Sequence, residues 1–262
     1  MNQTLINIHP SFLSIYISVS IIYLFDQFFK KRKYTAIISI LILILICFQI
    51  WLSSRAGLLS LIIAGIIYGF LRLKSNLRIY VTIAIFLIII AIFSIPLTKE
   101  RFIHAPLRAL KSGTGVNPID QQTWPFTFRL QITNCSIDLL KDFHWLYGYG
   151  TGDFRDEMYR CYEKMNYTWL TVRDFDEHNE YFAQIHRLGI LGLILLLLVF
   201  FYPMRIAYKT KSYLYLSFLI IFSLSCMSEN IFSSQKGVVF YAIFNTLLFI
   251  KYEYGNSRDK KL

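Results

Sequence analysis

Seven long apolar runs, separated by short polar segments, dominate this sequence. A membrane-crossing helix needs about 20 mostly apolar residues, and each run approaches or reaches that length. The runs make 55% of the chain hydrophobic and leave only 16% charged, which is too apolar for one soluble domain of 262 residues and excludes disorder. The sequence therefore predicts an all-α polytopic membrane protein, with spans at 11–29, 35–52, 56–71, 79–97, 188–204, 212–227 and 237–251.

The net charge of +11 lies almost entirely on one predicted side of the membrane. Lys and Arg are enriched in cytoplasmic segments, and basic clusters follow the first, third, fifth and seventh runs. The N-terminus and 98–187 are then expected outside, and no nucleic-acid partner is needed to explain the charge. The predicted divisions are four N-terminal spans in 1–97, a large outer loop at 98–187, three spans in 188–251 and a cytoplasmic tail at 252–262.

The outer loop is where we expect chemistry. It is far longer than a connector needs to be, and 98–186 hold 12 of the 16 acidic residues. Helical spacing predicts short helices at 129–141, with a stripe of Leu130, Ile137 and Leu140, and at 153–164, with Phe154, Met158, Cys161 and Tyr162 on one face.

Two features of this loop stay open at the sequence level. The four cysteines are too few for a disulfide framework, although Cys135 and Cys161 share the outer segment and could pair. The glycine-rich stretch Tyr147–Gly152 precedes a helix start at Asp153. It is either a plain tight turn, which we favour, or a set of free amides that contact phosphate oxygens.

His178 is the candidate for proton transfer. It belongs to a segment, 174–186, that runs directly into the fifth span. A continuous helix would put it about 15 Å along the axis from Leu188, at the depth of lipid head groups. Asp176 and Glu177 could orient it or raise its basicity, and the alternative is a solvated interfacial histidine.

A metal site has little support in the sequence. Asp174 and Asp176 match the short D-x-D pattern of metal-dependent sugar-nucleotide transferases, a tripeptide that arises often by chance. The other histidines of the loop lack ligand spacing; they are His104, His144 and His186. We therefore predict no metal and no cofactor.

Basic residues at the outer ends of spans are unusual, because Lys and Arg are depleted there. Arg55, Arg187 and Lys236 break that rule. An arginine fork matches phosphate oxygens, so convergent cations at this depth suggest a diphosphate clamp. The alternative is pairing with Glu229, Glu180 or lipid phosphates.

Several stretches together resemble the O-antigen ligase and O-antigen polymerase family of bacterial membrane proteins. They are Ser54-Arg-Ala-Gly-Leu58, Arg129 heading a helix that leads to Trp145-Leu-Tyr-Gly-Tyr-Gly150, His178-Asn-Glu-Tyr181 running into Leu188-Gly-Ile-Leu-Gly192, and the closing turn with Ser228-Glu229 and Gln235-Lys-Gly237. The resemblance covers about residues 10–250, nearly the whole chain, and the order of these stretches agrees with the predicted topology.

The resemblance implies a metal-independent, GT-C-like transferase of the bacterial inner membrane. It would move a glycan from a polyprenyl-diphosphate carrier to lipid A core, or to a growing glycan if it is a polymerase, on the periplasmic side. Arg55 and Arg129 would bind the diphosphate, and His178 would activate the acceptor hydroxyl or orient the donor. Asn179, Arg187, Glu229 and Lys236 are candidate supporting residues.

One departure from the family concerns the N-terminus. Only two predicted spans precede Ser54, where the family usually has several more. We therefore expect a member shortened at the N-terminus, which is a fragment of a longer reading frame, a degenerate copy, or half of a site completed by a partner subunit. A rival class is a non-catalytic transporter or scaffold subunit for lipid-linked sugars. Transporters usually place charges near the middle of spans, and the predicted spans here carry almost none.

Overall fold

The computed structural model describes residues 9–30, 34–52, 54–73, 94, 99–104, 107–108, 124–141, 144–172 and 175–259. All regular structure in these residues is helical, which confirms the predicted all-α class. The chain forms two compact units: one contains 1–87, 199–226 and 231–262, and the other contains 88–198 and 227–230. The predicted fourth span at 79–97 lies almost entirely outside the described residues.

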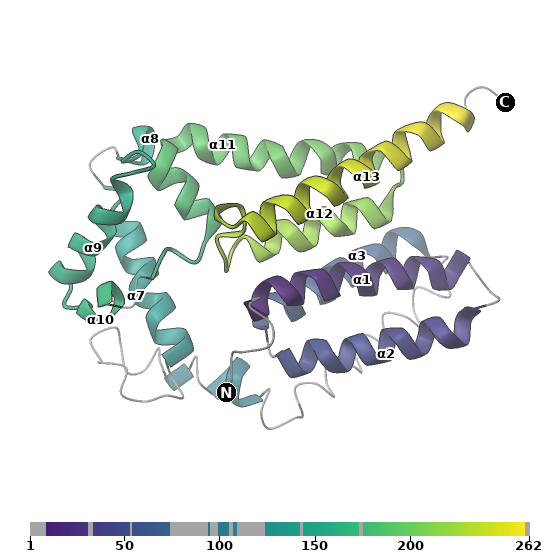
Figure 1. Ribbon diagram of the computed structural model, residues 1–262, viewed down its shortest axis with the longest axis horizontal. Helices are drawn as coiled ribbons and strands as arrows, with labels where there is room; N and C mark the ends of the chain where they lie inside the picture. The colour runs from purple at the N-terminus through teal and green to yellow at the C-terminus, as the bar shows by residue number, and fades with distance from the viewer. Residues whose placement is uncertain are drawn as a thin grey trace. The chain divides into compact units, whose positions relative to one another are not determined.

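The first unit is a helical bundle. Helices α1 (Pro10–Lys30), α2 (Thr35–Leu52) and α3 (Arg55–Arg72) lie side by side (Figure 1), and their bounds agree with the predicted spans within a residue. Helix α12 (Tyr213–Ser225) packs against α1, α3 and α13 (Gln235–Asp259), and a short 3₁₀ turn, η3 (Ile231–Ser233), precedes α13.

Four described helices are long and apolar enough to cross a membrane: α1, α2, α3 and α11 (Glu180–Lys209). Helix α12 is apolar but has only 13 residues, and α13 continues to Asp259, past the predicted end of its span at 251. Helix α2 exposes large apolar side chains over much of its surface, including Ile37, Leu43 and Trp51. Such a surface is costly in water and is stable against lipid, so this is a membrane protein.

Buried polar contacts join the helices of this bundle. Gln49 of α2 donates to Ser14 Oγ at 2.7 Å and to Ser18 Oγ at 3.1 Å, both on α1. Tyr68 of α3 donates its hydroxyl to Asp26 of α1 at 2.7 Å. A hydrogen bond satisfies a polar group that would otherwise be desolvated alone, so these contacts fix the register of the three helices.

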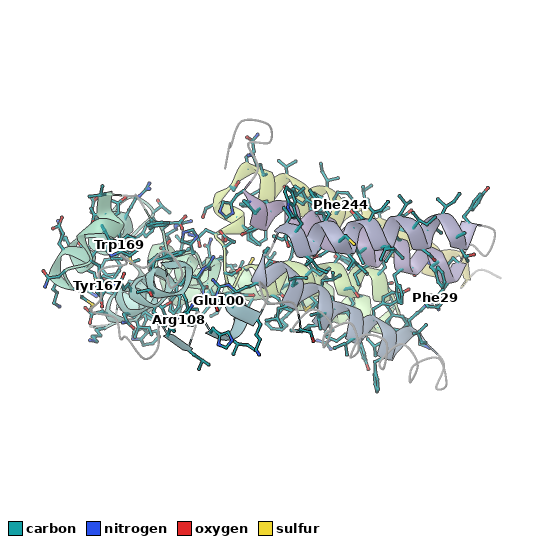
Figure 2. The ribbon with its side chains drawn as sticks, turned by 90° about the horizontal axis from the view of Figure 1, so that it is seen from below. Phe29, Glu100, Arg108, Tyr167, Trp169 and Phe244 are labelled. Atoms are coloured by element: carbon teal, nitrogen blue, oxygen red, sulfur yellow. A yellow bond between two sulfur atoms is a disulfide. The ribbon has the colours of Figure 1, made fainter. Side chains whose placement is uncertain are left out.

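The second unit contains α7 (Trp124–Asp138), α8 (His144–Tyr147), α9 (Phe154–Lys164), α10 (Thr168–Val172), the first part of α11 and a π-helical turn, η2 (Glu100–His104). Helices α9 and α7 pack around a core that includes Phe128, Ile132, Met158 and Tyr162. Tyr167 and Trp169 lie at the α10 side of this unit, and Glu100 pairs with Arg108 (Figure 2).

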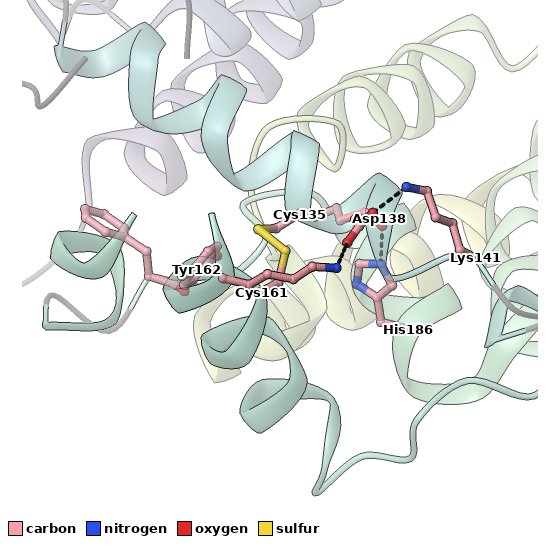
Figure 3. Close-up of a disulfide and its surroundings, with 9 residues drawn as sticks. Cys135, Asp138, Lys141, Cys161, Tyr162 and His186 are labelled. Carbon is pink, nitrogen blue, oxygen red and sulfur yellow. Dashed lines mark hydrogen bonds and ion pairs between the residues drawn. A yellow bond between two sulfur atoms is a disulfide. The ribbon is translucent and has the colours of Figure 1, made fainter. Parts of the chain in front are cut away.

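A disulfide joins Cys135 of α7 to Cys161 of α9 within this core, with a Cα–Cα distance of 5.8 Å (Figure 3). One turn further along α7, Asp138 pairs with Lys141 at 2.5 Å and with Lys164 of α9 at 3.6 Å. The pairing that the sequence left open is therefore present, and it fixes α7 against α9.

The predicted helix faces had different outcomes. All four residues predicted on one face of α9 are buried, which confirms that face. The predicted stripe on α7 was wrong, because Ile137 is 52% exposed while Phe128, Ile132, Cys135 and Leu139 are buried. The buried face follows the disulfide and the aromatic core, whereas the prediction used aliphatic residues alone.

The predicted continuous helix from 174 into the fifth span was also wrong. Helix α11 begins at Glu180, and its helical geometry breaks at Gly189, where φ is +64° and ψ is −156°. Figure 1 shows α11 as two segments that meet at an angle. His178 therefore precedes the helix, and the estimate of 15 Å along a helix axis does not apply.

Candidate active site

The turn Asp176–Asn179 places His178. Asp176 Oδ1 accepts the backbone N–H of His178 at 3.1 Å, and His178 itself has a φ of +46°. Asparagine and aspartate side chains often stabilise such turns by bonding a backbone N–H two residues on. Asn179 then caps α11, since its Oδ1 accepts N–H groups of Tyr181 at 3.0 Å and Phe182 at 3.3 Å.

The ring of His178 is oriented by a carboxylate that lies 51 residues away in the chain. Its Nδ1 is 3.3 Å from Glu229 Oε2, and the Glu229 side chain is only 8% exposed. A carboxylate accepts from an N–H, so this contact favours the tautomer with the proton on Nδ1 and a free lone pair on Nε2. Among the described residues Nε2 has no hydrogen-bond partner, and the side chain is 20% exposed.

Arg129 shares the same carboxylate. Its Nη2 is 3.2 Å from Glu229 Oε1, and its Nη1 donates to the carbonyl oxygen of Ser228 at 2.8 Å. A guanidinium has five N–H donors, so these contacts leave donors over, and the side chain is 35% exposed. Glu229 thus bridges a histidine with a free nitrogen and an arginine that can still bind an anion.

Aromatic rings line the other side of His178. The rings of Phe128 and Phe175 stack on each other with centroids 5.0 Å apart, and they lie 5.7 and 5.6 Å from the His178 ring. The Arg129 guanidinium also lies 5.6 Å from the Phe128 ring. Packed rings restrict rotation of the imidazole and reduce the water around it, which strengthens its contact with Glu229.

A second histidine–carboxylate pair is buried in the same unit. His186 Nδ1 is 3.4 Å from Glu177 Oε1, and His186 Nε2 is 3.0 Å from the carbonyl oxygen of Ser136. Asn230 donates to Glu177 Oε2 at 3.1 Å. Both paired side chains are 0% exposed. Glu177 was expected to orient His178, but it bonds His186 and Asn230 instead.

The pKa of Glu177 is lowered from its ordinary value near 4.5. Burial acts to raise that pKa, and the hydrogen bond with His186 and the positive charges of His186 and Arg187 lower it by more. The ionised carboxylate is therefore the stable form in the folded protein.

The backbone of the glycine-rich stretch Tyr147–Gly152 is hydrogen-bonded to other backbone segments of the protein. The N–H groups of Gly148, Tyr149 and Gly150 donate to the carbonyl oxygens of His144, His186 and Arg187 at 2.8, 2.6 and 3.1 Å. Those amides are therefore used within the protein, which supports the plain-turn interpretation over a phosphate contact. A Cβ on Gly189 would lie 2.1 Å from Leu146 O, so only glycine permits this approach.

Ser54-Arg-Ala-Gly57 starts α3 in the first unit. Ser54 caps the helix by accepting the N–H of Gly57 at 3.3 Å. A Cβ on Gly57 would lie 1.6 Å from Ser14 Oγ, so this glycine lets α1 approach α3. Arg55 is half-buried in the first turn of α3.

The remaining predicted cations have separate surroundings. The Arg187 guanidinium lies 4.6 Å from the Phe154 ring, while Lys236 is in the first turn of α13 and its carbonyl oxygen accepts the hydroxyl of Tyr16 at 3.0 Å. Within the second unit the structure brings together His178, Arg129 and Glu229, which are three of the predicted site residues. Asp174, of the D-x-D pattern, lies outside the described residues.

Sequence reasoning missed the inner contacts, namely those of His186, Asn230, Ser136 and the carbonyl of Ser228. Except for His186 and Glu177, which are nine residues apart, the partners in these contacts lie 50 to 99 residues apart in the chain, so spacing carries no signal of them. The position of Asn230 directly after Glu229, and of Glu177 directly before His178, was the one hint available.

Apolar spanning helices and a polar histidine–carboxylate–arginine group in a disulfide-linked unit define an integral membrane protein with a candidate catalytic group. The model of the O-antigen ligase family matches residues 40–197, more than half of the chain, and the chain belongs to that family. The matched segment includes Arg55, Arg129 and His178. Comparison with curated proteins and with solved structures gave no match.

Proposed function

We propose that this protein transfers a glycan from a polyprenyl-diphosphate carrier to an acceptor hydroxyl outside the cytoplasm, as an O-antigen ligase. The observation that carries the proposal is the bridging position of Glu229 between His178 Nδ1 at 3.3 Å and Arg129 Nη2 at 3.2 Å. Membership of the O-antigen ligase family supports the same class of reaction.

In the proposed reaction, the acceptor oxygen attacks the anomeric carbon of the sugar joined to the diphosphate. A glycosidic bond forms, the bond from carbon to diphosphate oxygen breaks, and the diphosphate leaves with the electron pair. His178 Nε2 takes the hydroxyl proton, while Glu229 stabilises the imidazolium through Nδ1–H. The spare donors of Arg129 bind the leaving diphosphate, because cations aimed at developing negative charge lower the barrier.

The shared carboxylate couples these two steps. In the absence of donor, Arg129 offsets part of the negative charge of Glu229. When a diphosphate engages the guanidinium, the carboxylate can stabilise the positive charge that develops on His178 as it takes the hydroxyl proton. Arg55 contributes a second cation to the diphosphate in this proposal, and Arg187 and Lys236 are supporting candidates.

The disulfide and the basic segments support the orientation. Disulfides persist in oxidising compartments such as the bacterial periplasm, which favours placing Cys135–Cys161, and the second unit with it, outside the cytoplasm. Lys30 and Arg72 lie in the last turns of α1 and α3, as expected for cytoplasmic ends. We propose seven spans in the inner membrane with the C-terminus in the cytoplasm.

The glycan ladder of a host lacking this gene tests the proposal. The ladder is compared after complementation with wild type, Arg129→Lys or the exposed control Arg160→Lys. Loss of polymer from lipid A core in the deletion strain, with polymer accumulating on the carrier, would support a ligase. Wild type and Arg160→Lys are expected to restore the ladder, and Arg129→Lys is expected to fail to restore it. A collapse to single repeat units would indicate a polymerase, and an unchanged ladder would overturn both.

A further inference from the structure

Two pairs of neighbouring residues in the second unit bond each other crosswise. Glu177 and His178 are consecutive, as are Glu229 and Asn230. His178 bonds Glu229 at 3.3 Å, and Glu177 bonds Asn230 at 3.1 Å. A single bond between two segments leaves them free to rotate about it, whereas two bonds on adjacent residues also fix their relative orientation.

The inner bond of this crosswise pair is anchored to α7 through His186. His186 bonds Glu177 at 3.4 Å and the carbonyl oxygen of Ser136 at 3.0 Å. Helix α7 also carries Arg129, which bonds Ser228 and Glu229. The contacts therefore close a ring from α7 through His186 and Glu177 to the 227–230 segment and back to α7.

We propose that Glu177, His186 and Asn230 form a buried clasp that positions His178 against Glu229. The three residues are at most 7% exposed, and Glu177 and His186 have side chains with no exposure at all, so they act through His178 and do not touch substrate. The catalytic consequence of the clasp rests on the proposed function; the clasp itself does not.

Hydrogen-bond accounting gives the clasp a specific chemical signature. Nε2 of His186 donates to the Ser136 carbonyl oxygen, and Nδ1 shares a hydrogen bond with the Glu177 carboxyl group, so both ring nitrogens of His186 are used. Glu177→Gln can keep every bond, because the new amide accepts from Asn230 and donates to Nδ1 of a neutral His186. Glu177→Ala can keep neither bond.

Hydrogen exchange and kinetics on the full-length protein in nanodiscs test the clasp. The variants are Glu177→Ala, Glu177→Gln and the exposed control Glu163→Ala on α9. Glu177→Ala is expected to speed amide exchange about tenfold in peptides covering 227–230, although the substitution is at 177, since it releases that segment locally. Glu177→Gln and Glu163→Ala are expected to leave the exchange close to wild type.

Kinetics separate positioning from a general loss of fold. Glu177→Ala is expected to lower kcat about tenfold or more with the KM for donor within about twofold, because misplacement of a base affects the chemical step. Glu177→Gln is expected to recover kcat to within about threefold. If Glu177→Ala does not fold, Asn230→Ala, which removes only one bond, is expected to give the same pattern more weakly.

Unchanged exchange at 227–230 in both Glu177→Ala and Asn230→Ala would overturn the clasp. An equal loss of kcat in Glu177→Gln and Glu177→Ala would also overturn it. If the variants show the expected differences in exchange but the wild-type protein has no transfer activity, the proposed function is overturned and the clasp stands.

Discussion

Glu229 accepts a hydrogen bond from Nδ1 of His178 at 3.3 Å, across 51 residues of sequence. This contact sets which ring nitrogen is free, so a residue outside the matched family segment at 40–197 controls one inside it. The orientation of His178 therefore depends on the turn after α12 as well as on its own turn.

Substitution of Glu229 is expected to lower transfer strongly. Glu229→Gln keeps an acceptor for Nδ1 but loses the charge that stabilises the imidazolium and pairs with Arg129, so we expect about a 100-fold fall in kcat. The measurement is transfer by purified protein. Glu157→Gln, which also breaks an arginine pair but on the surface of α9, should stay near wild type. Equal activity of the two variants would contradict the role of Glu229.

Gly189→Ala is expected to destabilise the protein by about 2 kcal/mol or more. The new methyl group would adopt a φ of +64° and lie 2.1 Å from Leu146 O, so both backbone strain and a clash with backbone oppose it. Thermal unfolding in detergent measures the effect. Gly152→Ala is the matched control, because nothing lies within 4 Å of its Cβ, and it should change stability little. A similar Tm for both variants would contradict the close approach of the two segments.

The disulfide is expected to leave two free thiols when the protein is denatured without reduction and four when it is denatured and reduced. Closing a loop of 26 residues stabilises a protein by about 3.5 kcal/mol in the chain-entropy model, so Cys135→Ser should lower Tm clearly. Thiol mass tagging and thermal unfolding test this, with Cys47→Ser, a free exposed cysteine, as control. Four thiols in the denatured but unreduced protein would refute the bond.

Acid should weaken the second unit through Glu177. Because its folded pKa is below the ordinary value near 4.5, its stabilisation is complete above that pH and is lost as pH falls through the folded pKa. Asp138, whose pKa is lowered chiefly by its hydrogen bond from Lys141, contributes in the same direction. Tm of the wild type measured from about pH 3 to 7 should therefore fall at the acid end, and Asp138→Asn, which removes one of the two carboxylates, should fall less steeply. Parallel curves would show that the Asp138 carboxylate contributes nothing.

Local features were accessible from sequence. Apolar length located α1, α2 and α3, and helical spacing found the buried face of α9 from Phe154 to Tyr162. The stripe on α7 failed because its burial depends on a disulfide partner 26 residues away. The prediction of a continuous helix into α11 failed because the helix breaks at Gly189, where the backbone of Leu146 approaches, and the sequence gives no sign of that approach.

The candidate site divides in the same way. His178 and Arg129 were predicted from residue type and family resemblance, and those predictions still await activity data. The direction in which the Glu177 side chain points could not be predicted. The backbone conformation at His178, with a φ of +46°, decides whether the side chain of Glu177 or of His178 turns toward the interior. Physical reasoning on a single sequence finds such a residue but not its long-range partner.

Transfer by the purified protein, with a polyprenyl-diphosphate-linked glycan and an acceptor, tests the central claim most directly. We expect wild type and His104→Ala, an exposed histidine of η2, to transfer glycan, and His178→Ala to lose at least about 1000-fold in kcat while remaining folded. Undiminished transfer by folded His178→Ala would contradict the account.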